Sequence, residues 1–316
     1  MSRLPPEAAG GVIGLGRAVS VTIQSVANYV RYLDLINAVS QPLPPMPVAR
    51  LGPPVLTALP VPLSQARVIL LNSAGVHVRG EEPFQPTNDL SVRQIATTYE
   101  PGQLRPSHPT PMRRPGLRDV NVVFPYQRLA ELAAAGVIGG ATPVHLSMLG
   151  AIKRLGRLAD EAAPAVVAAA RQHGADLLFI VPLCPACHQA MGVLARAVER
   201  LGLPTVSSTN ARDITELVRP PRSGFVNFPL GNSVGRPGEA AEQRSVCADI
   251  LALANRNEPA GMIIDLDYQW PETGWAAKVA EQYRDEAEVL RRQRSSEFED
   301  GKHYAADEVK AIAKRI

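Results

Sequence analysis

The chain has 316 residues, 46% of them hydrophobic and 20% charged, so it carries enough apolar side chains for a sizeable buried core. Its 33 basic and 30 acidic side chains leave a net charge of +3 and form no long run of either sign, so we expect no nucleic-acid binding. No stretch approaches the roughly 18 consecutive apolar residues of a membrane span. The mildly apolar segment 12–23 contains Arg17, so we expect neither membrane association nor a secretory signal.

Residues 1–65 are predicted to form an N-terminal helix and a connector outside the main fold. An amphipathic pattern near 22–39 predicts the helix, and the segment 41–62 holds eight prolines with almost no helical period. We therefore expect this segment to run as an extended connector over a core.

The predicted core, residues 66–270, begins with a strand at 66–72, whose uninterrupted β-branched and leucine residues indicate burial on both faces, as in a parallel sheet. Residues 81–115 form a long irregular insertion rich in Pro, Arg, Thr and Ser, of the kind that often covers a site. A strand at 119–125 and an amphipathic helix at 126–135 then predict a βα unit.

The second half of the core alternates between helix and strand. A helix at 159–173 precedes a buried strand at 175–183, and after a CxxC turn a helix at 189–202 leads into a strand that starts at Pro204. Elements in this order imply right-handed βαβ winding.

A last strand at 224–229 opens into a glycine-rich loop at 230–238, and a helix follows at 240–254. Residues 271–316 form a charged helical extension in which the sequence indicates no chemistry. We predict an α/β fold with a doubly wound, mainly parallel sheet and helices on both faces. Ligands of such folds bind at the carboxyl ends of the strands.

The chain has three cysteines, and two of them, Cys184 and Cys187, form a CxxC pair where a predicted buried strand meets a helix. An odd number of cysteines argues against a disulfide framework, so we expect a reducing cytoplasmic setting. The helix N-terminus favours a thiolate at the first cysteine, which can attack carbon or sulfur. The second thiol can resolve an adduct or close a disulfide, and a buried structural pair or half of a zinc site is the alternative.

Two other interpretations of the cysteines are weaker. The sequence CPACH matches the attachment motif of c-type haem, but the missing export signal and the strand-to-helix context argue against haem. A structural zinc needs four ligands, and only Cys247 and scattered histidines remain, so we expect no metal. Cys247 lies on an apolar helix face with Ile250 and Leu251 and is predicted to be a core thiol.

Three histidines and a serine are further candidates for the site. His188 follows the second cysteine and could stabilise a thiolate or move a proton, so we predict a catalytic role. His77 closes the loop after the first core strand, and His145, with Ser147 beside it, follows a strand-like segment, so both could bind substrate at the top of the sheet. The alternatives are ordinary loop, cap or solvent-facing positions.

The glycine-rich loop is predicted to bind a carboxylate. Backbone N–H groups around Gly231, Asn232 and Ser233 could cradle it, and Arg236 could add a bidentate clamp, whereas a tight turn with a solvated arginine is the alternative. The loop lacks GxGxxG and the chain lacks GK[ST], so we infer no nucleotide cofactor.

Several ordered blocks of the core resemble one known family, the selenoprotein B family of the glycine, sarcosine, betaine and D-proline reductases. The resemblance covers about two thirds of the chain. The blocks are AGVH at 74–77, DVNVVFP at 119–125, LADE from 158, LCPACHQA at 183–190 and FPLGNSVGRPG at 228–238.

The resemblance implies that the chain is an oxidoreductase, with Cys184 as the nucleophile and Cys187 as its resolving thiol. In that family the first position of the motif is selenocysteine or cysteine, and it attacks the α-carbon of a bound amine and expels the amine. Sulfur is the weaker nucleophile and leaving group, so reductive C–N cleavage of glycine or betaine does not follow from the motif alone.

The resemblance also implies partners. Several relatives work with a pyruvoyl-containing subunit that holds the amine as a Schiff base, and nothing in this chain could generate that group. We therefore expect no cofactor in the chain itself, an external dithiol or thioredoxin-like reductant, a small-molecule substrate, and other reductase-complex subunits or further copies of this chain as partners.

The sequence is compatible with three functions. The first is an enzyme in which Cys184 attacks a small amine- or carboxylate-bearing substrate. The second is a thiol–disulfide transfer component that docks to a protein partner. The third is a non-catalytic module that binds a carboxylate while its cysteines stay buried.

Overall fold

The first predicted core strand forms the centre of the sheet. β1 spans Arg67–Asn72, and every residue after Arg67 is buried. It pairs in parallel with β7 (Leu177–Val181) on one side and with β6 (Val144–Ser147) on the other, which explains its continuous apolar sequence. The computed structural model describes residues 29–256, 258–295, 297–298 and 301–316.

Within these residues an eight-stranded sheet runs in the order β10-β9-β8-β7-β1-β6-β3, with β5 paired beside β1. The pairings are parallel except for that of the edge strand β3 with β6. This confirms the predicted α/β fold with a mainly parallel sheet. The other strands of the sheet are β3 (Arg93–Ala96), β5 (Gly140–Ala141), β8 (Thr205–Thr209), β9 (Ser223–Asn227) and β10 (Ile263–Gln269).

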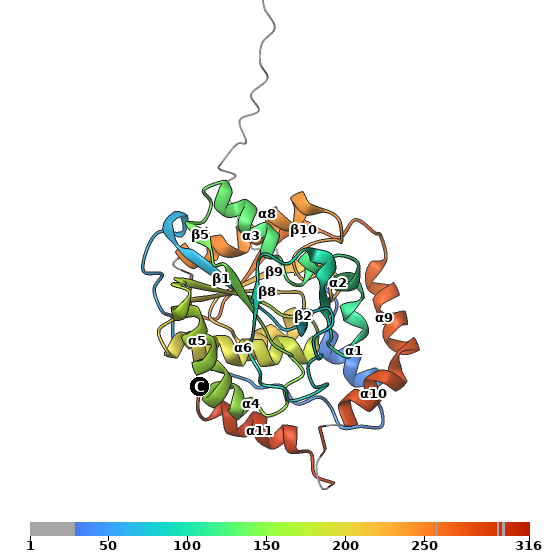
Figure 1. The fold of residues 1–316 in the computed structure, drawn as a ribbon. Helices are drawn as coiled ribbons and strands as arrows, with labels where there is room; N and C mark the ends of the chain where they lie inside the picture. The colour runs from blue at the N-terminus through green and yellow to red at the C-terminus, as the bar shows by residue number, and fades with distance from the viewer. Residues whose placement is uncertain (1–28, 257, 296, 299–300) are drawn as a thin grey trace, which may run out of the picture.

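Helices cover both faces of the sheet, as Figure 1 shows, with α3 and α8 on one side and α5 and α6 on the other. The four helices predicted in the core are confirmed, with ends that differ by a few residues. They are α3 (Tyr126–Ala134), the run of α4 (Leu155–Arg157), a π-helical turn (Leu158–Ala162) and α5 (Ala163–Gln172), then α6 (Pro185–Arg200) and α8 (Ala240–Ala252). The remaining α-helices are α1 (Tyr32–Val39), α2 (Arg114–Arg118), α7 (Arg212–Val218), α9 (Trp275–Asp285), α10 (Ala287–Ser295) and α11 (Tyr304–Ala313).

The chain changes direction between two neighbouring strands at the centre of the sheet. From β1 it continues to β6 on one side, and from β7 it continues to β8 on the other. Loops that leave adjacent parallel strands in opposite directions create a crevice at their carboxyl ends, where ligands of doubly wound folds bind. The two segments that meet there begin at Ser73, after β1, and at Pro182, before the cysteines.

The strand predicted at 119–125 is wrong. Val120–Val122 form a 3₁₀ turn that begins at Asp119, whose side chain accepts a hydrogen bond from the Asn121 backbone at 3.0 Å. A short buried apolar run looks the same in a strand and in a buried helical turn, and here the capping side chain decides between them.

The described part of the N-terminal segment contains one helix, followed by an extended segment. Of the predicted segment 22–39, residues 22–28 lie outside the described residues and α1 begins at Tyr32. The connector 41–62 has almost no regular structure, and its backbone at Ala49 and Leu51 donates hydrogen bonds to the Gln189 side chain and to the Leu217 carbonyl, both at 2.8 Å. It therefore runs over α6 and α7.

The irregular insertion contains the edge strand β3 and β4 (Leu104–Pro106), and β4 pairs antiparallel with β2 (Val76–Val78), which lies just before the insertion. The C-terminal extension 271–316 is helical, as predicted, and packs on the rest of the chain, with α10 against α1 and α11 against α4. Whether the three predicted parts behave as separate domains stays a prediction. Across the part of the chain that the structure describes, the helices are too short or too polar to span a bilayer.

Adjacent glycines offer a test of how tightly the start of β1 is packed. A Cβ at Gly139 would overlap the backbone carbonyl group of Gln65, whereas a Cβ at Gly140 would meet nothing within 4 Å. We expect Gly139→Ala to lower the free energy of unfolding by about 1–3 kcal/mol, because the backbone has to shift. The matched variant Gly140→Ala should stay near wild type in the same urea titration, and equal losses in both variants would contradict this packing.

Candidate active site

The two cysteines of the CxxC motif lie together at the N-terminus of α6. Their Sγ atoms are 2.8 Å apart, and both residues are buried, Cys184 at 6% exposure and Cys187 at 0%. Cys184 is the N-cap of α6, and its sulfur accepts a hydrogen bond from the Cys187 backbone N–H at 3.4 Å. Pro185 occupies the first helical turn, where its missing N–H costs nothing, so the local sequence favours this helix start.

The carboxyl end of β1 holds the cysteine turn in place. Ser73 Oγ accepts a hydrogen bond from the Leu183 backbone at 2.9 Å, and the Ser73 carbonyl lies 4.0 Å from Cys187 Sγ. Gly150 closes the far side, where a Cβ would lie 2.5 Å from Cys187 Sγ. The thiols therefore sit in the crevice at which the chain changes direction in the sheet.

A third group of the site, His108, was missed by the sequence analysis. Its Nε2 lies 3.3 Å from Cys187 Sγ and 3.6 Å from Cys184 Sγ. The irregular insertion supplies it, and its backbone N–H is fixed by the Ala74 carbonyl at 3.1 Å. The sequence signalled only that this insertion covers a site, because nothing in the local pattern around His108 links it to cysteines 76 residues away.

The two sulfurs are too close for both to carry a full negative charge, so the pair keeps at least one proton between them. Burial raises the pKa of the Cys184 thiol, and the charge of Cys187 raises it further. Burial also opposes charge on Cys187, but the hydrogen bond from Cys184 and the charge of His108 hold its pKa well below the usual value. The sequence favoured a thiolate at Cys184, whereas the hydrogen bond from Cys184 and the neighbouring His108 favour the negative charge on Cys187.

A small cavity of about 60 Å³ opens beside Cys184. Its walls are mostly apolar, and its polar lining includes His108, Lys153, Arg294 and Glu297. The lining comes from α1, the connector, the irregular insertion, the cysteine turn, α10 and the turn after α10. The C-terminal extension, in which the sequence indicated no chemistry, therefore forms part of the wall.

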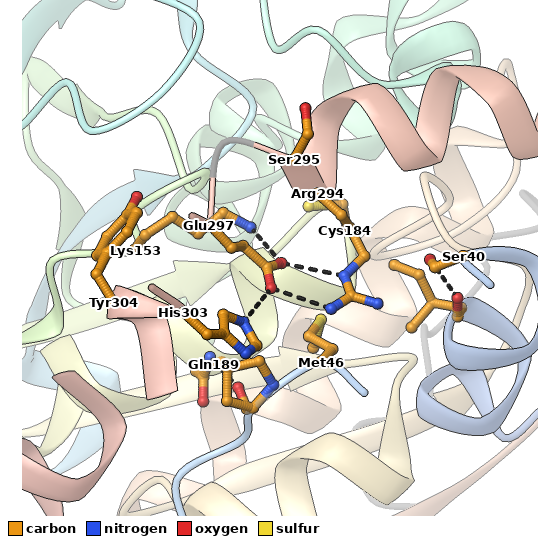
Figure 2. Close-up of polar contacts among 12 residues, drawn as sticks. Ser40, Met46, Lys153, Cys184, Gln189, Arg294, Ser295, Glu297, His303 and Tyr304 are labelled. Atoms are coloured by element: carbon orange, nitrogen blue, oxygen red, sulfur yellow. Dashed lines mark hydrogen bonds and ion pairs between the residues drawn. The ribbon is translucent and has the colours of Figure 1, made fainter. Parts of the chain in front are cut away.

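The charged wall of this cavity is organised around one buried carboxylate. Figure 2 shows Lys153, Arg294 and His303 converging on Glu297, whose side chain is only 1% exposed. Burial alone would raise the pKa of Glu297, but Lys153, Arg294 and the hydrogen bond to His303 lower it to about 2. Glu297 is therefore ionised at neutral pH and ties the C-terminal extension to the core.

Of the residues predicted from sequence, His188 lies next to the thiols but turns away from them. Its Nδ1 lies 2.8 Å from the Cys184 carbonyl, and its Nε2 accepts a hydrogen bond from the Asn210 backbone at 3.2 Å. Burial lowers its pKa, so the ring is neutral. With both nitrogens bound to backbone groups, His188 is arranged to shape the cysteine turn, and a catalytic role for it stays a prediction.

His77, His145 and Ser147 are buried and do not border the thiol cavity. His77 lies on β2, with Nδ1 3.3 Å from the Gly75 carbonyl. His145 lies on β6, where Nδ1 accepts a hydrogen bond from the Leu70 backbone at 3.2 Å and burial lowers its pKa to about 3. Ser147 Oγ donates to Asn72 at 3.5 Å. These three residues do not contact the thiols, and their role in binding substrate stays a prediction.

The predicted carboxylate clamp is occupied by a side chain of the protein itself. Arg236 binds the Glu242 carboxylate through Nε at 2.9 Å and Nη2 at 2.7 Å. Gly231 packs against the Met112 carbonyl, and Asn232 lines a second, larger cavity of about 260 Å³ that borders no cysteine or histidine. The loop therefore does not bring Arg236 to the thiols, and its role in binding a ligand stays a prediction.

The thiol site also contains three potential metal donors. Within the described residues, the ligand atoms of His108, Cys184 and Cys187 all lie within 4.8 Å of one another. Zinc accepts sulfur and imidazole ligands, but a closed structural site has four of them, so we assign no metal here. The expected absence of a metal stays a prediction.

Comparison with known proteins found one distant relative, a reductase subunit. The chain is 25% identical over 218 residues to D-proline reductase subunit gamma of Acetoanaerobium sticklandii, a match that covers 69% of the chain and 90% of that protein. No protein-family model and no solved structure matches the chain. The chain is therefore a distant homologue of a subunit of an amino-acid reductase, which supports a reductase-like role. The resemblance seen in the sequence is confirmed at this coarse level, while its assignment to selenoprotein B stays a prediction.

The thiol pair predicts how the reactivity of Cys184 depends on pH. Because Cys184 passes its proton to the Cys187 thiolate as it attacks, its alkylation by iodoacetamide should follow the ionisation of Cys187, whose pKa is lowered. The rate should therefore rise with a midpoint well below the ordinary cysteine value of about 8.5. In His108→Ala the midpoint should move up, and the rate at pH 7 should fall several-fold. Peptide mass spectrometry follows each cysteine separately.

The variant His77→Ala removes another buried histidine that does not touch the sulfurs, and it serves as the control. It should keep the wild-type pH profile. A profile that does not change in His108→Ala would show that His108 does not stabilise the thiolate.

Proposed function

We propose that this protein is a thiol-dependent reductase in which Cys184 attacks a small amine- or carboxylate-bearing substrate and Cys187 resolves the adduct. The observation that carries the proposal is the buried pair of sulfurs, 2.8 Å apart, with His108 beside it and a cavity open at Cys184 only. The distant homology to a D-proline reductase subunit supports the same class of chemistry.

In the first step Cys184 Sγ attacks the substrate carbon that bears the leaving group. A C–S bond forms, the bond to the leaving group breaks with its electron pair, and the Cys184 proton passes to the neighbouring Cys187 thiolate. Cys187 is suited to accept this proton because the two sulfurs lie within hydrogen-bond distance.

In the second step Cys187 gives its proton to the departed group and attacks Cys184 Sγ as a thiolate. The S–S bond forms, the C–S bond breaks, and the carbon keeps the electron pair and takes a proton from solvent. The substrate carbon gains two electrons, and the two cysteines lose them as a disulfide. An external dithiol or thioredoxin-like protein then reduces the disulfide.

The proposed chemistry also involves partner subunits. The relative is one subunit of D-proline reductase, so further subunits are proposed as partners here. If the substrate amine has to be held as a Schiff base, a pyruvoyl-containing subunit would supply that group. In this proposal the present chain contributes the thiol pair and the cavity.

The second candidate is a non-catalytic carboxylate-binding module, because both sulfurs are buried. Burial also weighs against the thiol–disulfide component, since a docking protein would have to reach the sulfur of Cys184, a residue that is only 6% exposed. Neither alternative explains why His108 lies so close to the sulfurs.

Single cysteine variants separate these functions. With glycine, sarcosine, betaine or D-proline as substrate and dithiothreitol as reductant, Cys187→Ser should accumulate a substrate adduct on Cys184. The adduct should form slowly, because the proton acceptor is missing, and persist, because the resolving thiol is missing. Cys184→Ser should form no adduct and no product. Intact-protein and peptide mass spectrometry detect the adduct, and chromatography measures the product.

Cys247→Ser is the control, because Cys247 is buried on α8 away from the cavity and burial raises its pKa. It should behave as the wild type does. Turnover that survives in Cys184→Ser would contradict the role of Cys184 as the nucleophile. Thiols that stay unmodified with every amine tested while a carboxylate binds saturably would favour the binding module.

A further inference from the structure

One nitrogen of a buried arginine at the thiol cavity has no partner. Arg294 borders the cavity together with Cys184, and its side chain is 3% exposed. Among the described residues its Nη1 finds no hydrogen-bond acceptor. A buried charged donor without an acceptor is costly, so this position favours the arrival of an anionic or carbonyl oxygen.

The other two nitrogens hold the guanidinium in place. Nη2 donates to the Pro44 carbonyl at 2.6 Å and to Glu297 at 3.1 Å, and Nε donates to Glu297 at 3.2 Å. Arg294 is therefore fixed between the connector and the turn after α10, and only Nη1 is left for a ligand. A preorganised arginine loses little entropy when it binds a planar carboxylate.

The charges at the cavity favour an anion as well. Three charged side chains line it, the positive Lys153 and Arg294 and the negative Glu297. Lys153 Nζ binds Glu297 at 3.1 Å, with its side chain 13% exposed. Because the site is largely shielded from water, the two positive side chains act on a bound ligand with little screening.

We propose that Arg294, supported by Lys153, binds a carboxylate oxygen of the substrate beside Cys184. This inference rests on the proposed function. It assigns carboxylate recognition to the C-terminal extension, in place of the loop at Arg236, whose guanidinium is already bound to Glu242. The cavity of about 60 Å³ has room for only a few non-hydrogen atoms, which fits a small acid.

Two alkylating reagents that differ in one charged group provide the test. Iodoacetate carries a carboxylate next to the carbon that the sulfur attacks, and iodoacetamide carries a neutral amide of the same size. We expect wild-type Cys184 to react with iodoacetate saturably and to show a high ratio of the iodoacetate rate to the iodoacetamide rate. In Arg294→Met this ratio should fall by about tenfold or more, because a hydrogen bond to a charged group is lost.

Two further variants keep the test decisive if Arg294→Met disturbs the fold. Glu297→Gln removes the internal carboxylate that competes for Arg294 and Lys153, so the ratio should rise above the wild-type value. Arg292→Met is the matched control, because Arg292 lies two residues away on α10, is 80% exposed and pairs with Glu288. It should leave the ratio unchanged.

The outcomes separate this inference from the proposed function. Cys184 that reacts fast with iodoacetamide but shows the same ratio in the wild type, Arg294→Met and Glu297→Gln would overturn carboxylate binding by Arg294 and leave the thiol chemistry intact. Cys184 that is inert to both reagents in the wild type would overturn the proposed function itself, and the inference with it.

Discussion

The proton shared between two sulfur atoms 2.8 Å apart is the interaction on which the rest of the site depends. A single buried thiol would be neutral and unreactive, since burial raises its pKa, as it does for Cys247. A second sulfur within hydrogen-bond distance and the imidazole of His108 change this, because the negative charge can rest on Cys187 while Cys184 keeps a proton that it can pass on. The result is a buried pair that can carry charge and stay hidden from water.

The fold produces this pair by joining segments that are far apart in the sequence. The centre of the sheet brings the ends of β1 and β7 together, and the N-terminus of α6 fixes the first cysteine. The irregular insertion then delivers His108, and the C-terminal extension delivers Arg294 and Glu297. The scaffold is the kind of rigid, doubly wound sheet that carries many activities, so the specificity of this protein depends on the segments that cover it.

The sequence predicted the central sheet and its helices better than the segments that cover the site, for a physical reason. Local patterns of apolar and polar residues predict the strands and helices of the core. Such patterns predict the segments of β1, β7, α6 and α8. The CxxC pair was found because its spacing and its place at a helix start are local too. His108, Arg294 and Glu297 act through contacts across the fold, and nothing near them in the chain signals that they meet Cys184. The apolar run 119–125 failed for the opposite reason, because its local pattern fits two structures equally well.

A redox titration of the reduced protein in buffers of defined dithiol–disulfide potential tests the central claim most directly, with the pairing of each cysteine read by peptide mass spectrometry. The account predicts a reversible disulfide between Cys184 and Cys187, with a midpoint in the range of catalytic dithiols, roughly −270 to −120 mV, while Cys247 stays reduced. Cysteines 184 and 187 that remain free thiols across this whole range would contradict it, because the two sulfurs would then be a structural pair and not a working one.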